Sequence, residues 1–514
     1  MKTRLALGHQ EFSTVIRNEC IYVDKTEDIY RLIKGGSYYF LSRPRRFGKS
    51  LLANTIKELF RGSKEMFKGL WIYDKWDWEK KYPVIKISFS NISHNVIGLE
   101  QAIHGALDYV AEEKKLVLKS GSYPEKFQEL ITKLSEKSKV IVIIDEYDKP
   151  IIDHMDDIPK AEQNRDILKN FYSVIKDSDE HIRFLFITGV SKFSHVSIFS
   201  DLNNLVDITV DENYPEITGF TKTELENYFP GYIKRAGEKY KDIYPDIMKE
   251  IKNWYNGYSW DGKTRVYNPV SVMNFFSKRD FRNYWFSTGT PTMLMDIIKE
   301  QKLTAFDIEE SYTSSEILDK YDFKNIKFSS LLFQTGYLTI DSINIRNRRI
   351  KLDYPNNEVR EAFSKHILAE QTRMYLDESQ SLLFKIIDSF IDNKIDVLIG
   401  YLNTLFKNIP YSLVENKESY FHSLFYLVVK LTGFEIETEV LTIDGRIDAV
   451  IKTDSHIYIV EFKINQSAKK AIGQINDKEY QLKYTDDKRP VSLLGINFDT
   501  EKKKIDDYLL EHYQ

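Results

Sequence analysis

The chain has 514 residues, which is too long for one ordinary domain and predicts two or three. Hydrophobic residues make up 42% of it and aromatic residues 14%, so the composition excludes a disordered protein. The formal net charge of −4, from 73 basic and 77 acidic residues, excludes attachment to nucleic acid by bulk positive charge, and any such contact must be local.

Cysteine usage and apolar patterning bear on the compartment. The single cysteine, Cys20, excludes an internal disulfide and a cysteine-rich metal cluster. The first residues lack the apolar core of a signal peptide, and no uninterrupted apolar run has the length of a membrane span. We therefore expect a cytoplasmic protein that has no membrane partner.

The first chemical motif begins at an apolar run, residues 38–41, which predicts a short buried strand. A loop with Pro44 and Gly48 follows, and residues 50–60 then form an amphipathic helical pattern. Strand, loop, Gly-Lys-Ser and helix is the layout of a phosphate-binding P-loop. Backbone N–H groups at the helix start would bind phosphate oxygens, Lys49 would supply positive charge, and the Ser50 hydroxyl could join a Mg²⁺ shell.

The pattern departs from the general P-loop at one position. The general motif has a glycine five residues before Gly48, and this chain has Arg43 there. A basic surface loop with solvated arginines is therefore the alternative. On the P-loop interpretation, we predict nucleotide contacts at Arg45, Arg46, Phe47, Gly48, Lys49, Ser50, Leu51 and Asp145.

A second motif favours the P-loop interpretation. Residues 140–144 are five consecutive β-branched apolar residues, typical of a strand that is buried on both faces of a parallel sheet. Asp145 and Glu146 follow at the carboxyl end of this strand, where open α/β sheets bind ligands. In a P-loop ATPase the first acid would hold Mg²⁺ and the second would polarise the attacking water. A strand end followed by a polar turn is the alternative.

Further strands are predicted at 83–89, 183–189 and 205–210, with helices at 99–118, 123–137 and 161–176. This alternation predicts a doubly wound parallel α/β sheet. Thr188 and Ser191, after the strand at 183–189, could sense a γ-phosphate or could simply form a turn.

The character changes after Gly219. Residues 221–224 form a capping box, and helix-rich sequence follows. Residues 337–345 and 349–354 predict a hairpin with a basic tip, either the wing of a winged-helix fold that contacts nucleic acid or a solvated turn. Polar helices at 358–375 and 380–408 would connect to the final domain.

The last third predicts a helix, three strands, a helix and a closing strand at 491–497. If residues 454–455 form a two-residue turn, Thr453 pairs with His456, and the same register places Asp448 opposite Glu461. Like charges so placed repel each other unless a cation lies between them. Lys463 projects from the same face, because strand side chains alternate. The three side chains could form a divalent-metal site or a salt-bridged surface hairpin.

These motifs resemble a bacterial family that joins an AAA-ATPase-like domain to a C-terminal PD-(D/E)XK nuclease domain. The resemblance covers nearly the whole chain, and the Arg43 departure is usual in that family. It is carried by residues 22–26, 39–50, 144–148, 267–269, 287–291, 334–338, 418–422, 445–448, 461–463 and 474–475.

The resemblance implies roles for individual residues. Asp448 and Glu461 would bind Mg²⁺ with the Phe462 carbonyl, and Lys463 would orient or deprotonate the attacking water. Glu418, on the helix before the strands, would support the metal. Gln474, on the helix after them, would hold the site.

We therefore expect a P-loop NTPase domain over 1–215, a helical lid and winged-helix-like region over 216–375, and a PD-(D/E)XK nuclease-like α/β domain over 376–514. We expect a protein that binds and hydrolyses ATP and is coupled to a Mg²⁺-dependent nuclease. The nuclease would cleave nucleic acid, with DNA as the expected substrate. A homo-oligomer is a possible assembly. One alternative is a signalling or scaffold ATPase whose nuclease fold is only a binding module. Another keeps the nuclease site but has a P-loop that binds nucleotide without turnover.

Overall fold

The computed structural model describes residues 3–192, 198–199, 202–285, 294–295, 297–298, 312–314, 328–408, 417–441 and 446–513. For residues 417–420, 422, 439–441, 446 and 447 it describes the backbone alone. The chain folds into two compact units. The first comprises Met1–Gly289 and Glu310–Arg360, and Glu361–Gln514 make up the main part of the second.

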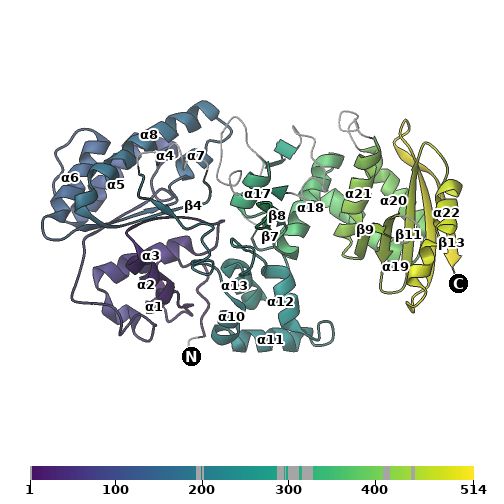
Figure 1. Ribbon diagram of the computed structural model, residues 1–514, viewed down its shortest axis with the longest axis horizontal. Helices are drawn as coiled ribbons and strands as arrows, with labels where there is room; N and C mark the ends of the chain where they lie inside the picture. Colours follow the sequence, from purple (N-terminus) through teal and green to yellow (C-terminus); the bar gives the residue numbers. More distant parts are fainter. Residues whose placement is uncertain are drawn as a thin grey trace. The chain divides into compact units, whose positions relative to one another are not determined.

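A parallel sheet of five strands lies between two layers of helices in the first unit (Figure 1). The strand order is β2-β3-β4-β1-β5. The strands are β1 (Tyr38–Ser42), β2 (Val84–Ser88), β3 (Val140–Asp145), β4 (Ile182–Gly189) and β5 (Val206–Asp207). Every residue of β1 and β3 is buried, which explains their continuous apolar sequences. Because β4 lies between β1 and β3, its last residues separate the P-loop from the carboxylates that end β3.

Helices cover both faces of this sheet, which confirms the predicted doubly wound fold (Figure 1). One face carries α1 (Phe12–Arg17), α2 (Thr26–Gly35) and α3 (Lys49–Arg61). The other carries α4 (His94–Ile97), α5 (Leu99–Glu113), α6 (Tyr123–Ser135), α7 (Lys149–Ile152) and α8 (Ile158–Asp177). Two 3₁₀ turns complete this part, η1 (Lys64–Phe67) and η2 (Asp179–His181). Strand β5 is shorter than predicted, with only two residues.

The rest of the first unit is mainly helical. It contains α10 (Lys222–Tyr228), α11 (Pro230–Tyr240), α12 (Ile247–Tyr255), α13 (Pro269–Lys278) and α17 (Phe328–Thr335). The capping box is confirmed: the Thr221 hydroxyl and the Glu224 carboxylate each accept a bond from the other's backbone N–H. The hairpin is confirmed as β7 (Thr339–Asn344) and β8 (Arg349–Asp353), and β6 (Tyr312–Thr313) adds a strand beside β8.

The second unit is entered through α18 (Asn357–Thr372), whose first residues belong to the first unit. Helices α19 (Leu376–Ile391), α20 (Ile395–Lys407) and α21 (Lys417–Leu431) follow. A mixed sheet comes next, in the order β13-β12-β11-β10-β9. Its elements are β9 (Glu435–Leu441), β10 (Arg446–Lys452), β11 (Ile457–Ile464), α22 (Ala468–Asp477), η4 (Tyr480–Tyr484), β12 (Val491–Asp499) and β13 (Lys504–Tyr513).

Two details of this unit correct the sequence analysis. Strand β12 is not the last element, because β13 pairs with it along its whole length. Strand β13 lies at the sheet edge and is mostly exposed, so its sequence lacks the apolar run that marks a buried strand. The helix expected over 380–408 is two helices, α19 and α20, separated at Asn393, which has a left-handed φ of 53°.

The two faces of the mixed sheet pack against different helices. Ile472 of α22 belongs to a cluster with Val450 and Ile459 on one face. On the other face, the Phe462 ring packs edge-on against Phe425 of α21, with centroids 4.9 Å apart. The face that carries Glu461 and Lys463 is therefore the one that α22 covers. Among the described helices, none has both the length and the apolar character needed to cross a bilayer.

Candidate nucleotide-binding and nuclease sites

The P-loop is shaped by Gly48 and by the start of α3. Gly48 has φ 87°, a left-handed conformation that residues with a Cβ rarely adopt. It precedes α3 directly and offers no side-chain cap to the helix. The first N–H groups of α3, including those of Lys49, Ser50 and Leu51, therefore have no side-chain acceptor at the helix start and can receive an anion.

Lys49 lies inside the loop. Its side chain is buried, and Nζ donates hydrogen bonds to the carbonyls of Arg43 at 2.8 Å and Pro44 at 3.0 Å. Burial lowers the pKa of Lys49, while the carboxylates of Glu146 and Asp145 act in the opposite direction. Two loop carbonyls thus hold the ammonium inside the P-loop.

A cavity of about 470 Å³ opens above this loop, a volume within the range of nucleotide-sized ligand sites. The loop side of its wall includes Arg45, Arg46 and Glu146. The remaining walls come from residues 6–10, 21–23, 25, 217–220, 269–270 and 273–274. These wall residues are not among the predicted contacts, because no local sequence pattern shows that they meet the P-loop.

Arg43, which occupies the position of the first glycine of the general P-loop motif, has a structural role. Its side chain is buried, Nη1 donates to the carbonyls of Ser42 and Thr209, and the guanidinium lies 3.9 Å from the centroid of the Trp260 ring. Burial lowers the pKa of Arg43 to about 9. Phe47 packs edge-on against Trp260 as well, with centroids 5.4 Å apart. Both side chains fix the loop to the middle region, so Arg43 is not the solvated surface arginine of the alternative interpretation.

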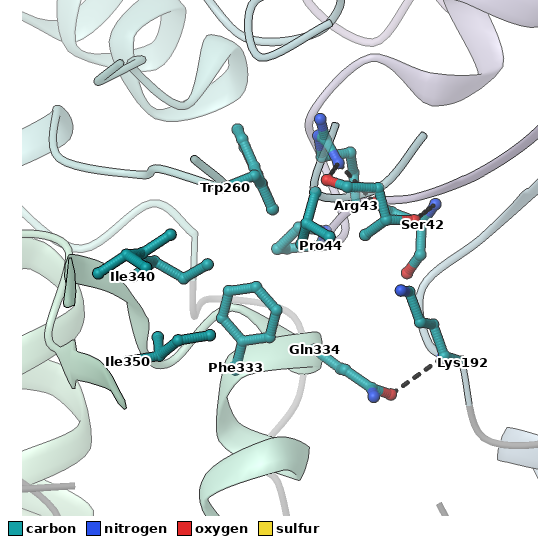
Figure 2. A pocket seen from close by; sticks show the side chains of 12 residues that line it. Ser42, Arg43, Pro44, Lys192, Trp260, Phe333, Gln334, Ile340 and Ile350 are labelled. Carbon is teal, nitrogen blue, oxygen red and sulfur yellow. Dashed lines mark hydrogen bonds between the residues drawn. The ribbon is translucent and has the colours of Figure 1, made fainter. Parts of the chain in front are cut away.

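A second, smaller cavity of about 140 Å³ lies behind the loop (Figure 2). Figure 2 shows Pro44, Trp260 and Phe333 around it, with Lys192 and Gln334 at its polar side. The Gln334 Oε1 accepts a hydrogen bond from the Lys192 backbone N–H at 2.9 Å. Its mostly apolar lining is typical of imperfect packing between two layers and does not match a phosphate site.

The carboxyl end of β3 is held by the neighbouring strand. The Thr188 hydroxyl on β4 donates to Asp145 Oδ1 at 2.6 Å and accepts from the Glu146 backbone N–H at 3.3 Å. The Ser90 hydroxyl donates to the Glu146 carboxylate. Thr188 thereby orients the Asp145 carboxylate and holds the Glu146 backbone, and Ser90 holds the Glu146 carboxylate. The Ser191 hydroxyl instead donates to buried Asp148 at 2.7 Å, and burial raises the pKa of Asp148.

The register of the C-terminal hairpin is confirmed. The Thr453 N–H donates to the His456 carbonyl at 2.9 Å, and Ala449 pairs with Val460. The next step along the same register places Asp448 opposite Glu461. Asp448 Oδ2 accepts a hydrogen bond from the Phe462 backbone N–H at 2.9 Å, which fixes the position of this carboxylate.

Lys463 lies against Glu461, and Gln474 lies against Lys463. The Lys463 ammonium donates to Glu461 Oε1 at 3.0 Å, to the Phe462 carbonyl at 3.2 Å and to Gln474 Oε1 at 2.8 Å. Gln474, on α22, therefore holds the lysine from the helix that covers this face. Glu418 lies in the first turn of α21, and its side chain is outside the described residues.

Glu461 fits a cation ligand. Its side chain is 2% exposed, and buried Oε2 has no hydrogen-bond partner among the described residues. Burial, reinforced by the negative charge of Asp448, raises the pKa of Glu461 to about 7. A divalent cation would satisfy the unpartnered oxygen and offset the repulsion between the carboxylates. In the described part of the chain, no group of three His, Cys, Asp or Glu side chains gathers as a metal cluster, so two carboxylates and a backbone carbonyl are the available oxygens.

Together, the P-loop, the carboxylate-ended strand and the Asp-Glu-Lys face define a P-loop ATPase-like unit followed by a nuclease-like unit. Residues 6–199 match the family model described as a predicted AAA-ATPase, and residues 416–508 match the PD-(D/E)XK nuclease superfamily. A relative from Azotobacter chroococcum mcd 1, described as an uncharacterized protein in the vnfD 5′ region, is 36% identical over 527 residues and is covered over 99% of both chains. The chain belongs to the family of bacterial AAA-ATPase-like proteins with a C-terminal PD-(D/E)XK nuclease domain.

Proposed function

We propose that the first unit binds and hydrolyses ATP with Mg²⁺. The support is the geometry of the loop: uncapped N–H groups at the start of α3, the Lys49 ammonium bonded to two loop carbonyls, and a cavity of nucleotide size above them. Asp145 and Ser50 would hold Mg²⁺, which would offset the charge on the phosphates. Glu146, fixed by Ser90 and by Thr188, would polarise the attacking water.

We further propose that the second unit is a Mg²⁺-dependent nuclease acting on nucleic acid, with DNA as the expected substrate. The observation that carries this proposal is the unpartnered, buried Oε2 of Glu461 beside Asp448. Asp448, Glu461 and the Phe462 carbonyl would hold the metal, which would stabilise the charge that develops on a phosphodiester. Gln474 holds Lys463 beside Glu461. As an ammonium, Lys463 would orient the attacking water, and only as a neutral amine would it take up the proton of that water.

The ATP site is tested by two substitutions. Lys49→Ala removes the ammonium that is proposed to contact the β- and γ-phosphates, so the affinity for ATP in calorimetry should fall by about two orders of magnitude. Glu146→Gln should keep the affinity and reduce hydrolysis by about two to four orders of magnitude. Unchanged affinity in a folded Lys49→Ala variant would refute the P-loop assignment.

The nuclease site is tested by cleavage of single- and double-stranded substrates. Asp448→Ala and Glu461→Ala should each lower Mg²⁺-dependent cleavage by about three orders of magnitude and leave ATP affinity unchanged. Lys463→Ala should be inactive and should still bind Mg²⁺, since the ammonium acts on water and phosphate. Variants that cleave at the rate of the wild type would refute these roles.

A second candidate function is a scaffold ATPase whose nuclease fold only binds a partner. The Lys463–Glu461 ion pair favours it, because this pair already neutralises one of the two acids. On this alternative, the wild type would show neither Mg²⁺ binding at Asp448 and Glu461 nor cleavage, with or without ATP. Mg²⁺-dependent cleavage that needs Asp448 would exclude it.

A further inference from the structure

A short segment, Tyr284 and Trp285, lies against the outer turn of the P-loop. The Arg46 guanidinium donates a hydrogen bond to the Tyr284 carbonyl, and the Trp285 indole N–H donates one to the Arg45 carbonyl at 3.3 Å. Gly336 allows close packing here, because a Cβ at this position would lie 2.6 Å from Pro44 and 3.2 Å from the Trp285 ring. The outer turn of the loop is therefore bonded to a segment almost 240 residues further along the chain.

Glu358 holds this segment from the other side. Its Oε1 accepts hydrogen bonds from the backbone N–H groups of Tyr284 at 2.6 Å and Trp285 at 2.8 Å, and from the Ser271 hydroxyl at 3.1 Å. The residue is completely buried, and burial raises the pKa of Glu358 to about 7. A buried carboxyl group costs free energy, and here its contacts fix one two-residue segment.

The P-loop turn needs this support. Arg46 has φ 71°, a left-handed conformation that is unfavourable for a residue with a Cβ. Its guanidinium bond to the Tyr284 carbonyl helps to keep it there. Turns that include a left-handed residue direct successive N–H groups into one concavity, which is the arrangement that binds phosphate. The shape of the phosphate cradle thus depends on Tyr284, and Tyr284 depends on Glu358.

We propose that Glu358 is a positioning residue for nucleotide binding, acting through Tyr284 and Trp285, and that it links occupancy of the P-loop to the first turn of α18. This inference rests on the proposed ATP-binding function. Glu358 is the second residue of α18, which continues to Thr372, and the chain from Glu361 onward belongs to the second unit. A rearrangement of the loop around phosphate therefore reaches the helix that leads into the nuclease-like unit. Such a linkage is reciprocal, so changes at this helix turn also alter nucleotide affinity.

The first test is the affinity for ATP by calorimetry in variants of the full chain. Glu358→Ala should weaken ATP binding by about tenfold or more, because three hydrogen bonds to the acceptor are lost. Glu358→Gln should recover most of the affinity, since its amide oxygen can accept the same bonds. Glu361→Ala is the matched control. Glu361 is on the same helix, partly exposed and paired with Lys365, and its removal should leave the affinity unchanged.

The second test separates positioning from a purely structural role. ATP should change the fluorescence of Trp285, obtained as the difference between the wild type and Trp285→Phe, and this response should be absent in Glu358→Ala at saturating ATP. Hydrogen exchange of the wild type should show that ATP slows exchange at amides 357–361, a measurement that needs no variant to fold.

The outcomes are distinct. A wild type that does not bind ATP would overturn the ATP proposal and this inference with it. A wild type that binds ATP, with unchanged affinity in Glu358→Ala, a retained Trp285 response or unaltered exchange at 357–361, would overturn the role of Glu358 alone.

Discussion

Glu461 is a buried acid whose ionisation would decide when the proposed metal site takes up a cation. Its pKa is raised to about 7 by burial and by Asp448. A metal binds the ionised carboxylate, so binding must displace the proton at lower pH. We expect the affinity for Mg²⁺ to rise by about tenfold per pH unit below pH 7 and to level off above it. Titration calorimetry between pH 5.5 and 8.5 measures this. A flat profile would mean that Glu461 is not a ligand.

The same shift predicts how stability depends on pH without metal. Between pH 4.5, the ordinary pKa of a glutamate, and about pH 7, the folded protein holds a proton on Glu461 and the unfolded chain does not. Stability from this group is therefore highest at low pH and falls as pH rises through that window, by up to about 3 kcal/mol. Glu461→Gln removes this loss, so its melting temperature at pH 8 without metal should equal or exceed that of the wild type. A variant that melts far below the wild type would show a structural role for the ionised acid.

At the scale of elements, the P-loop is held by side chains that are unusual for such a loop. Arg43 stacks on Trp260 and bonds to two carbonyls where the general motif has glycine. Arg43→Gly would restore the general motif and remove these contacts. We expect it to destabilise the first unit by about 2–4 kcal/mol, from the lost packing, cation–π contact and hydrogen bonds. Thermal or denaturant unfolding measures the change, and an unaltered midpoint would contradict this role.

Local sequence predicted the elements that have a clear pattern. Strands β1 and β3 are recognisable because both faces are buried, and the two-residue turn at 454–455 was enough to predict the register of Asp448 and Glu461. Strand β13 was missed, because an exposed edge strand has no apolar run. The contacts of Arg43 with Trp260 and of Glu358 with Tyr284 were out of reach as well, since they join segments that are far apart in the sequence.

At the scale of the whole molecule, the two proposed sites lie in different compact units, and each ligand should stabilise its own unit. A ligand at 100 times its dissociation constant adds about 2.7 kcal/mol to the stability of the unit that binds it. Because two units need not unfold in one step, each should be followed separately, for example by proteolysis at rising temperature with peptide identification. Mg²⁺ should still protect the second unit in Lys49→Ala, and ATP should still protect the first unit in Asp448→Ala. If Lys49→Ala also abolished the protection by Mg²⁺, or if Asp448→Ala also abolished the protection by ATP, the two sites would not be separate.

The most direct test of the metal-dependent nuclease site is the position of Mn²⁺ in crystals of the full chain, located by anomalous scattering as a substitute for Mg²⁺. We predict one ion between the Asp448 and Glu461 carboxylates, about 2.0–2.3 Å from their oxygens and close to the Phe462 carbonyl. The Lys463 ammonium should remain bonded to Gln474. An ion-free site at saturating Mn²⁺, with the Lys463–Glu461 pair intact, would contradict the nuclease assignment and favour the scaffold function.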